Sequence, residues 1–165
     1  MNTNNKIILK ENKTLKLNNV LIRELSEKEF MDINRVTYMM ESYIKSKGNS
    51  IIGPMINYSS LVNDDKGNPK LIVKIIFQLK NSIDNVNEPY EYQKQIKVTN
   101  CLFARFNEKE ENLQFAYSKL QLHAFENDIK LLGSSYTVFV DKKEDRIVAD
   151  VFMKTEIEGE TIESI

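Results

Sequence analysis

Residues 20–29, Val20-Leu21-Ile22-Arg23-Glu24-Leu25-Ser26-Glu27-Lys28-Glu29, recur 81 positions later as Cys101-Leu102-Phe103-Ala104-Arg105-Phe106-Asn107-Glu108-Lys109-Glu110. A second match follows in the same order, because Ile52-Gly53 recurs as Leu132-Gly133 at an offset of 80. Matches in the same order at nearly one offset predict an internal duplication, and this repeat decides the fold.

A third match extends the repeat to the end of each half. Residues 71–78, Leu-Ile-Val-Lys-Ile-Ile-Phe-Gln, recur as residues 146–153, Arg-Ile-Val-Ala-Asp-Val-Phe-Met, at an offset of 75. A tandem pair of small α+β units builds a groove at its pseudo-twofold axis, and a groove of this kind is the natural place for a ligand.

Composition limits the class of protein. The 165 residues suffice for one well-packed domain, and 41% hydrophobic with 28% charged residues is ordinary for a globular chain. No run of about 18 apolar residues indicates a membrane span, and residues 1–6 do not resemble a secretory signal, so we expect a cytoplasmic protein. The net charge is −1 with basic and acidic residues interspersed, which argues against direct nucleic-acid binding.

The chain has one cysteine, Cys101, and one histidine, His123. A single cysteine excludes an intrachain disulfide, and this pair of residues is too small a set for the usual zinc sites. Cys101 begins an apolar run and is expected to be a small buried residue, whereas His123 is expected at the surface. We therefore expect no metal and no cofactor.

The first half is predicted to contain a strand and a capped helix. Residues 1–19 form a polar arm with one possible strand at Lys6–Lys10, and a strand covers Val20–Leu25. Ser26 and Glu29 have the spacing of a capping box, and the helix that follows ends at Gly48. The buried stripe of this helix is expected to consist of Phe30, Ile33, Val36, Met40, Tyr43 and Ile44.

Two further strands, at about 51–62 and 71–80, are predicted to pair as a hairpin across the Asp-, Gly- and Pro-containing turn at 63–70. Residues 81–95 are polar and contain Pro89, which is typical of a connection between halves. A connection of about 15 residues is long for a compact domain, and it is therefore a candidate for a function or for covering a sheet edge.

The second half repeats this plan. A strand is predicted at about 96–106, followed by a helix that Asn107 and Glu110 cap and that runs to about Lys130. Its core stripe is expected to consist of Leu113, Ala116, Tyr117, Leu120, Ala124 and Phe125. The remaining elements are strands at 134–140 and 146–155, a tight turn between them at 141–145, and an acidic tail at 156–165.

The predicted fold class is α+β. Each half is a β-α-β-β unit, and the two copies join into one mainly antiparallel sheet with both helices on one face. The predicted organisation is a single domain over residues 20–155, with repeats at 20–80 and 96–155, and the other face of the sheet is left concave or covered by loops and arms.

The pattern resembles the GyrI-like or SOUL-type effector-binding domain, which is built from two such repeats. Residues 133–140, Gly-Ser-Ser-Tyr-Thr-Val-Phe-Val, resemble the Gly…Glu-x-Tyr strand of that family, and residues 149–153, Ala-Asp-Val-Phe-Met, resemble its closing acidic strand. The resemblance implies a domain that binds hydrophobic, often cationic, small molecules, either fused to a bacterial transcription regulator or free-standing. Some members of the family hydrolyse small electrophilic ligands.

The sequence departs from the family at the residue that carries its chemistry. Thr137 stands where the family has a buried Glu, and a threonine hydroxyl neither pairs with a cation nor serves as a good general base. The acidic position of the closing strand is kept as Asp150, whereas Lys154 replaces the usual Pro. A looser resemblance, through Ile52-Gly53-Pro54, is to small GyrI-like proteins of Gram-positive bacteria that accompany secreted-toxin systems.

The candidate ligand-binding residues are mostly aromatic side chains that supply apolar area, with two polar contacts. They are Tyr43, Tyr58, Phe77, Tyr117, Tyr136, Thr137, Asp150 and Phe152. The alternative is that these aromatics are core, because strand alternation sends half of them towards the helices.

Asp150 is the best single site candidate, because a carboxylate within an apolar run is costly to bury without a partner. The alternative is an Asp150 that faces solvent. Its counterpart in the first half is Ile75, and Lys74, which matches Ala149, is a conceivable partner.

The leading hypothesis is therefore a binding module that does no chemistry and holds a small hydrophobic molecule between the two repeats. No nucleophile has a recognisable base beside it, and no phosphate-binding Gly-rich loop occurs. The alternative is a protein-interaction, chaperone or accessory subunit, conceivably of a toxin-secretion system, and the third hypothesis is a small-molecule hydrolase.

Overall fold

The computed structural model describes residues 7–156 of the chain. Residues 1–6 and 157–165, which include part of the expected arm and most of the expected tail, lie outside the described residues. The elements are β1 (Ile7–Glu24), α1 (Ile33–Ser46), β2 (Ile56–Asn63), β3 (Pro69–Gln78), β4 (Tyr90–Lys109), α2 (Gln114–Glu126), β5 (Leu131–Lys143) and β6 (Arg146–Thr155).

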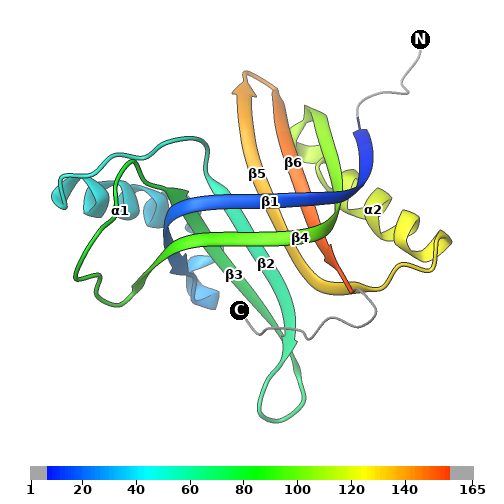
Figure 1. Cartoon of the computed structure of the whole chain (residues 1–165), viewed down its shortest axis with the longest axis horizontal. Helices are drawn as coiled ribbons and strands as arrows, with labels where there is room; N and C mark the ends of the chain where they lie inside the picture. The colour runs from blue at the N-terminus through cyan, green and yellow to red at the C-terminus, as the bar shows by residue number, and fades with distance from the viewer. Residues whose placement is uncertain (1–6, 157–165) are drawn as a thin grey trace.

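The six strands form one antiparallel sheet in the order β1-β3-β2-β5-β6-β4, and β4 pairs with β1 to close it. Each half contributes β-α-β-β, and the halves join where β2 pairs with β5. Both helices pack on the same face of this sheet, α1 against the first half and α2 against the second (Figure 1). The predicted α+β fold with a duplicated repeat is confirmed.

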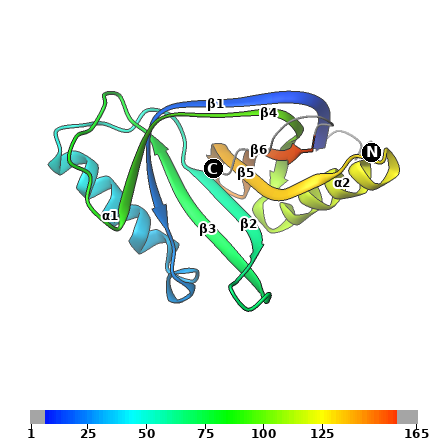
Figure 2. The ribbon, with the colours of Figure 1, turned by 60° about the horizontal axis from the view of Figure 1, so that its bottom comes forward.

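The two long strands β1 and β4 cover the opposite face of the sheet. They pair with each other over most of their length, and they cross the β2–β3 and β5–β6 hairpins as a two-stranded ribbon (Figure 2). Leu15 pairs with Val98 and Leu17 with Ile96 in the middle of this ribbon. The concave face expected from the repeat is thus covered by strands.

Two segments expected outside the repeats belong to this ribbon. Residues 7–19 were expected as a polar arm and are the first part of β1, while residues 90–95 were expected in the connection and begin β4. Leu15 and Leu17 alternate with Thr14, Lys16 and Asn18, which is the pattern of a half-buried strand. Positive φ angles at Asn19 and Asn100 coincide with the bends of the ribbon.

The helices begin later than predicted. Ser26 and Glu29 do interact as a capping box predicts, but they lie in a 3₁₀ turn, and α1 starts at Ile33. Strand β4 continues through Asn107 to Lys109, and α2 begins only at Gln114. Asn107 therefore does not cap α2 as predicted.

The core stripe of α1 is confirmed, because its buried residues are Val36, Met40 and Ile44 and its other predicted members pack against them. The stripe of α2 is correct at Ala116, Leu120 and Ala124. It is wrong at Phe125, which is 83% exposed.

The pseudo-twofold axis passes between Asn57 and Thr137, which lie directly opposite each other on β2 and β5. Ile22 corresponds to Phe103 at the offset of 81 found in the sequence. Ile22 pairs with Ile76, and Phe103 pairs with Phe152, so Phe152 corresponds to Ile76 at an offset of 76. The sequence match predicted an offset of 75 for these strands, which is wrong by one residue. The counterpart of Asp150 in the first half is therefore Lys74 and not Ile75.

Candidate functional site

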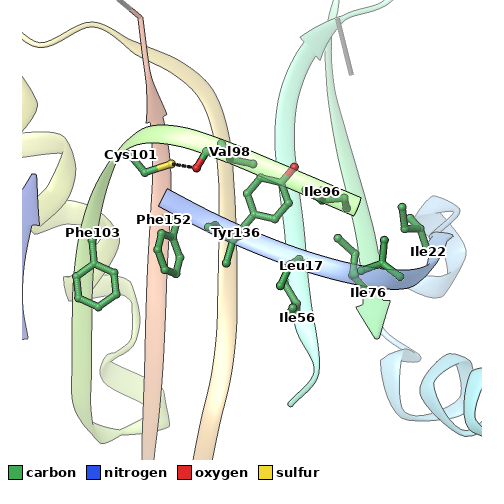
Figure 3. Close-up of a cluster of buried hydrophobic side chains, with 12 residues drawn as sticks. Leu17, Ile22, Ile56, Ile76, Ile96, Val98, Cys101, Phe103, Tyr136 and Phe152 are labelled. Carbon is green, nitrogen blue, oxygen red and sulfur yellow. Dashed lines mark hydrogen bonds between the residues drawn. The ribbon is translucent and has the colours of Figure 1, made fainter. Parts of the chain in front are cut away.

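Three of the predicted aromatics lie under the ribbon. Tyr136 and Phe152 face the side that β1 and β4 cover, where Leu17, Ile96 and Val98 of the ribbon belong to the same buried cluster (Figure 3). Tyr58 packs against this cluster. Tyr136 is 3% and Phe152 is 9% exposed. The rings are in contact, with centroids 4.9 Å apart for Tyr58–Tyr136 and 5.1 Å for Phe103–Phe152. This side of the sheet is therefore a packed core.

Two more predicted aromatics, Tyr43 and Phe77, belong to a different cluster beneath α1. Phe77 is buried, and the Tyr43 ring stacks on Tyr90 with centroids 4.2 Å apart. The structure therefore separates Phe77 from Phe152, although the two are matched in the repeat. The physical reason is the one-residue change in offset, which sends equivalent phenylalanines to opposite faces of the sheet.

Tyr117 and Thr137 lie together on the helix face. Thr137 is 2% exposed, and its hydroxyl is hydrogen-bonded to the hydroxyl of Tyr117 on α2. Burial raises the pKa of Tyr117, which keeps the phenol neutral at ordinary pH. At the position where the resembling family has a Glu, this chain therefore holds a neutral, already paired hydroxyl.

The first half lacks the matching hydrogen bond. By the pseudo-twofold, Asn57 corresponds to Thr137 and Thr37 corresponds to Tyr117, since buried α1 and α2 residues match at an offset of 80. The Thr37 hydroxyl donates instead to the carbonyl of Ile33 at 2.8 Å. Asn57 Oδ1 is buried without a hydrogen-bond partner among the described residues. An unpaired buried oxygen of this kind invites a donor from water or a ligand.

Asp150 is paired with Arg105 on the neighbouring strand. Arg105 Nε and one terminal nitrogen each donate to a carboxylate oxygen of Asp150 at 2.7 Å. The pair lies on the ribbon face, with side-chain exposures of 47% for Arg105 and 12% for Asp150. The partner of Asp150 is thus not the conceivable Lys74, whose ammonium lies 5.6 Å from the Tyr58 ring centroid.

We expect Asp150→Asn to lower the free energy of unfolding by about 1 kcal/mol, because half-exposed Arg105 regains water when its partner loses charge. Urea denaturation at neutral pH measures this change. Asp145→Asn, in the exposed β5–β6 turn, serves as the control and should leave stability unchanged. A loss above about 3 kcal/mol would instead show a fully buried ion pair.

A groove of the helix face lies where the two repeats meet, beside α2. Its volume is about 360 Å³, and at its base the Ser59 and Ser135 hydroxyls, on paired strands, are 3.0 Å apart. The groove is lined by Ser59, Ser60, Leu61, Leu71, Gln114, Tyr117, Gln121, Leu131, Gly133, Ser134, Ser135 and Met153. None of these described lining residues carries a charge, an imidazole or a thiol.

Of the predicted site residues, only Tyr117 lines this groove. Its hydrogen-bond partner Thr137 is the next residue after Ser135 on the same face of β5. The serines and glutamines were missed. A usable signal was present, since Asn57 and Ser59 on β2 and Ser135 and Thr137 on β5 are polar residues on one face of otherwise apolar strands.

A larger cavity, of about 490 Å³, lies at the edge where β1 and β4 meet the end of α2. Two of its lining residues, Lys130 and Glu156, pair with each other at 3.0 Å. It contains none of the predicted site residues, and its charges are partly neutralised internally.

The single cysteine and histidine have structural partners. Cys101 is fully buried, its thiol lies 3.6 Å from the Val98 carbonyl, and burial raises its pKa to about 11, which makes it unreactive. His123 Nε2 lies 2.6 Å from Glu11 Oε1 near the surface. Residues 7–156 contain no cluster of three or more His, Cys, Asp or Glu able to hold a metal ion. Neither helix in that range is long and apolar enough to span a membrane.

No protein-family model matches this sequence, and no curated protein matches it. Several solved structures share its fold. The C-terminal domain of EcmrR aligns with a TM-score of 0.60 and 15% identity, covering 91% of this chain and 96% of that domain. In an EcmrR–DNA complex the TM-score is 0.64 at 14% identity, and there the match spans only 57% of the longer EcmrR chain.

Two further structures cover nearly the whole chain. SAV2435, solved bound to tetraphenylphosphonium, aligns with a TM-score of 0.50 and 9% identity over 91% of this chain and 93% of its own. A protein of Listeria innocua described as a hydrolase aligns with a TM-score of 0.51 and 6% identity over 92% of each chain. At these identities the likeness establishes the fold, and the fold is the one expected from the resemblance to effector-binding domains.

Proposed function

We propose that this chain is a non-enzymatic binding module of the GyrI-like type that holds a small, uncharged molecule in the groove beside α2. The observation that carries the proposal is the groove at the junction of the repeats, which combines leucine and methionine side chains with serine and glutamine. Such a lining suits a ligand with an apolar body and one or two hydrogen-bonding groups.

The comparisons support a ligand, and the residues support its neutrality. SAV2435 has this fold and was solved with tetraphenylphosphonium, a lipophilic cation. Thr137 cannot supply the negative charge that a cation needs, and its hydroxyl is already bonded to Tyr117. A cation in this groove would lose its hydration without gaining an ion pair, which is unfavourable.

The absence of chemistry in the proposal rests on the same lining. The described residues around the groove include no carboxylate, imidazole or thiol that could act as a base or nucleophile. The Ser59 and Ser135 hydroxyls are hydrogen-bonded to each other at 3.0 Å. This bond uses only one of the two O–H groups, so the pair can still donate a hydrogen bond to a ligand.

We propose a bacterial, cytoplasmic setting for the module.

A pair of near-isosteric probes tests the proposal: neutral triphenylphosphine oxide, whose oxygen accepts hydrogen bonds, and cationic methyltriphenylphosphonium. We expect the oxide to raise the melting temperature by roughly 3–6 °C at about ten times its Kd, and the cation to have no effect. Titration calorimetry would give both affinities.

Ser135→Leu should fill the base of the groove and abolish the shift with the oxide. Ser42→Leu makes the same chemical change on the exposed face of α1 and should leave the shift intact. Preferential binding of the cation, or an oxide shift that survives Ser135→Leu, would contradict the proposal.

A second candidate function, a protein-interaction or accessory subunit, is favoured by a separate observation. The outer face of α2 carries large apolar side chains that the described part of the chain leaves exposed.

A further inference from the structure

The outer face of α2 carries large apolar side chains at three positions where α1 carries polar ones. Phe115 is 59%, Leu122 is 56% and Phe125 is 83% exposed. The buried residues of the helices match at an offset of 80, so these three positions correspond to Arg35, Ser42 and Lys45 of α1, all exposed. The exposed apolar side chains of α1 are Tyr38 and Met39, which match Ser118 and Lys119 of α2. The duplicated fold therefore does not require apolar side chains at positions 115, 122 and 125, and their presence on α2 needs another explanation.

The spacing of this face identifies the kind of partner. Phe115, Ser118, Leu122 and Phe125 are separated by three, four and three residues, which are the a and d positions of a helix-pairing seam. Leu120 lies on the opposite side of the helix, in the core. The stripe is therefore a second seam, directed away from the sheet and shaped to receive another helix.

The seam is self-complementary when two copies run antiparallel. In that arrangement a positions meet d positions, so Phe115 contacts Phe125 of the partner subunit and Ser118 contacts Leu122 of the partner subunit. The two phenylalanines thus pack against each other, and the leucine packs against the small serine. The twofold symmetry gives each of these contacts twice.

The charges beside the seam favour the same arrangement. Lys119 and Glu126 occupy the e positions, and antiparallel pairing brings the e positions of the two copies to the same side of the seam, so that Lys119 flanks Glu126 of the partner subunit as well as the partner's Lys119. Lys119 is exposed, and its ammonium donates to the Ile7 carbonyl of β1 at 3.0 Å. Parallel pairing would set Lys119 beside glutamine and lose this complementarity.

We propose that two copies of this chain associate through antiparallel packing of α2, about a twofold axis that crosses the seam at the level of Leu120 along the helix. A helix of 13 residues supplies only four seam layers, so the interface is small and the dimer is weak. Gln114 and Gln121 flank the seam and also line the groove, so the partner subunit lies beside the candidate ligand site. The dimer does not depend on that site binding a ligand.

Sedimentation velocity of the full chain from about 1 to about 200 µM tests the dimer. The wild type should shift from monomer to dimer, and a Phe115→Arg, Leu122→Ser, Phe125→Lys variant, which copies the face of α1, should stay monomeric. Met31→Lys with Tyr38→Lys removes exposed apolar side chains near and on α1 and should leave the dimer unchanged. Circular dichroism confirms that each variant is folded.

A charge exchange tests the antiparallel register. Lys119→Glu should weaken dimerisation about tenfold, because it opposes like charges, and adding Glu126→Lys should restore it. A wild type that is monomeric at about 200 µM, a dimer that survives the triple variant, or a double variant no better than Lys119→Glu would overturn the proposal.

Discussion

Replacing Phe152 with alanine should lower the free energy of unfolding by about 3–4 kcal/mol, because the ring is buried in the packed cluster beneath the ribbon. Its removal takes away the edge-on contact with Phe103 and leaves a cavity that β1 and β4 cannot close without bending further. Urea denaturation followed by far-ultraviolet circular dichroism measures the loss, since the chain has no tryptophan.

Phe125→Ala is the matched control, because it removes the same ring from a site that is 83% exposed. It should change stability by less than about 0.5 kcal/mol at concentrations where the chain is monomeric. Phe152→Ala should also leave the affinity for triphenylphosphine oxide unchanged, since Phe152 does not line the groove. If the Phe152→Ala variant kept full stability but failed to bind the oxide, Phe152 would be a ligand-binding residue and not a core residue.

The repeat could be predicted from sequence because its signals are local. Apolar spacing predicted α1, and apolar runs that contain Ile and Val predicted β3 and β6. Polar ribbons are harder to detect. Residues 7–19 contribute only a few apolar side chains, and those in the middle, Leu15 and Leu17, lie between polar residues. Their strand character depends on pairing with Ile96 and Val98, nearly 80 residues away, which no short sequence window contains.

The predicted site residues are not gathered at one place, and the reason is geometric. In a strand, a shift of one residue sends a side chain to the opposite face, so the aromatics matched by sequence, Phe77 and Phe152, lie on different sides of the sheet. The departure at Thr137 was visible in the sequence. Its bond to Tyr117 was not, because that contact depends on how α2 packs over β5.

Acidification should remove one ion pair that ties β1 to the turn before α1. Arg23 is 8% exposed, and it donates to both carboxylate oxygens of Glu29, at 3.0 and 2.7 Å. These bonds and the backbone N–H of Ser26 lower the pKa of Glu29 from 4.5 to about 2. A pKa that is lower in the folded state means stability that is present above about pH 4.5 and lost as the pH falls towards 2.

We therefore expect the wild type to lose about 2 kcal/mol of unfolding free energy between pH 7 and pH 3 that Glu29→Gln does not lose. Glu29→Gln should be less stable at pH 7, because it leaves the Arg23 guanidinium buried beside a neutral amide, and the gap from wild type should narrow on acidification. Urea denaturation across this range measures both curves. Glu27→Gln removes an exposed carboxylate from the same turn and should give a curve parallel to wild type. If the Glu29→Gln curve ran parallel to wild type as well, the Arg23–Glu29 pair would carry no pH-dependent stability, and the acid sensitivity would have to come from other carboxylates.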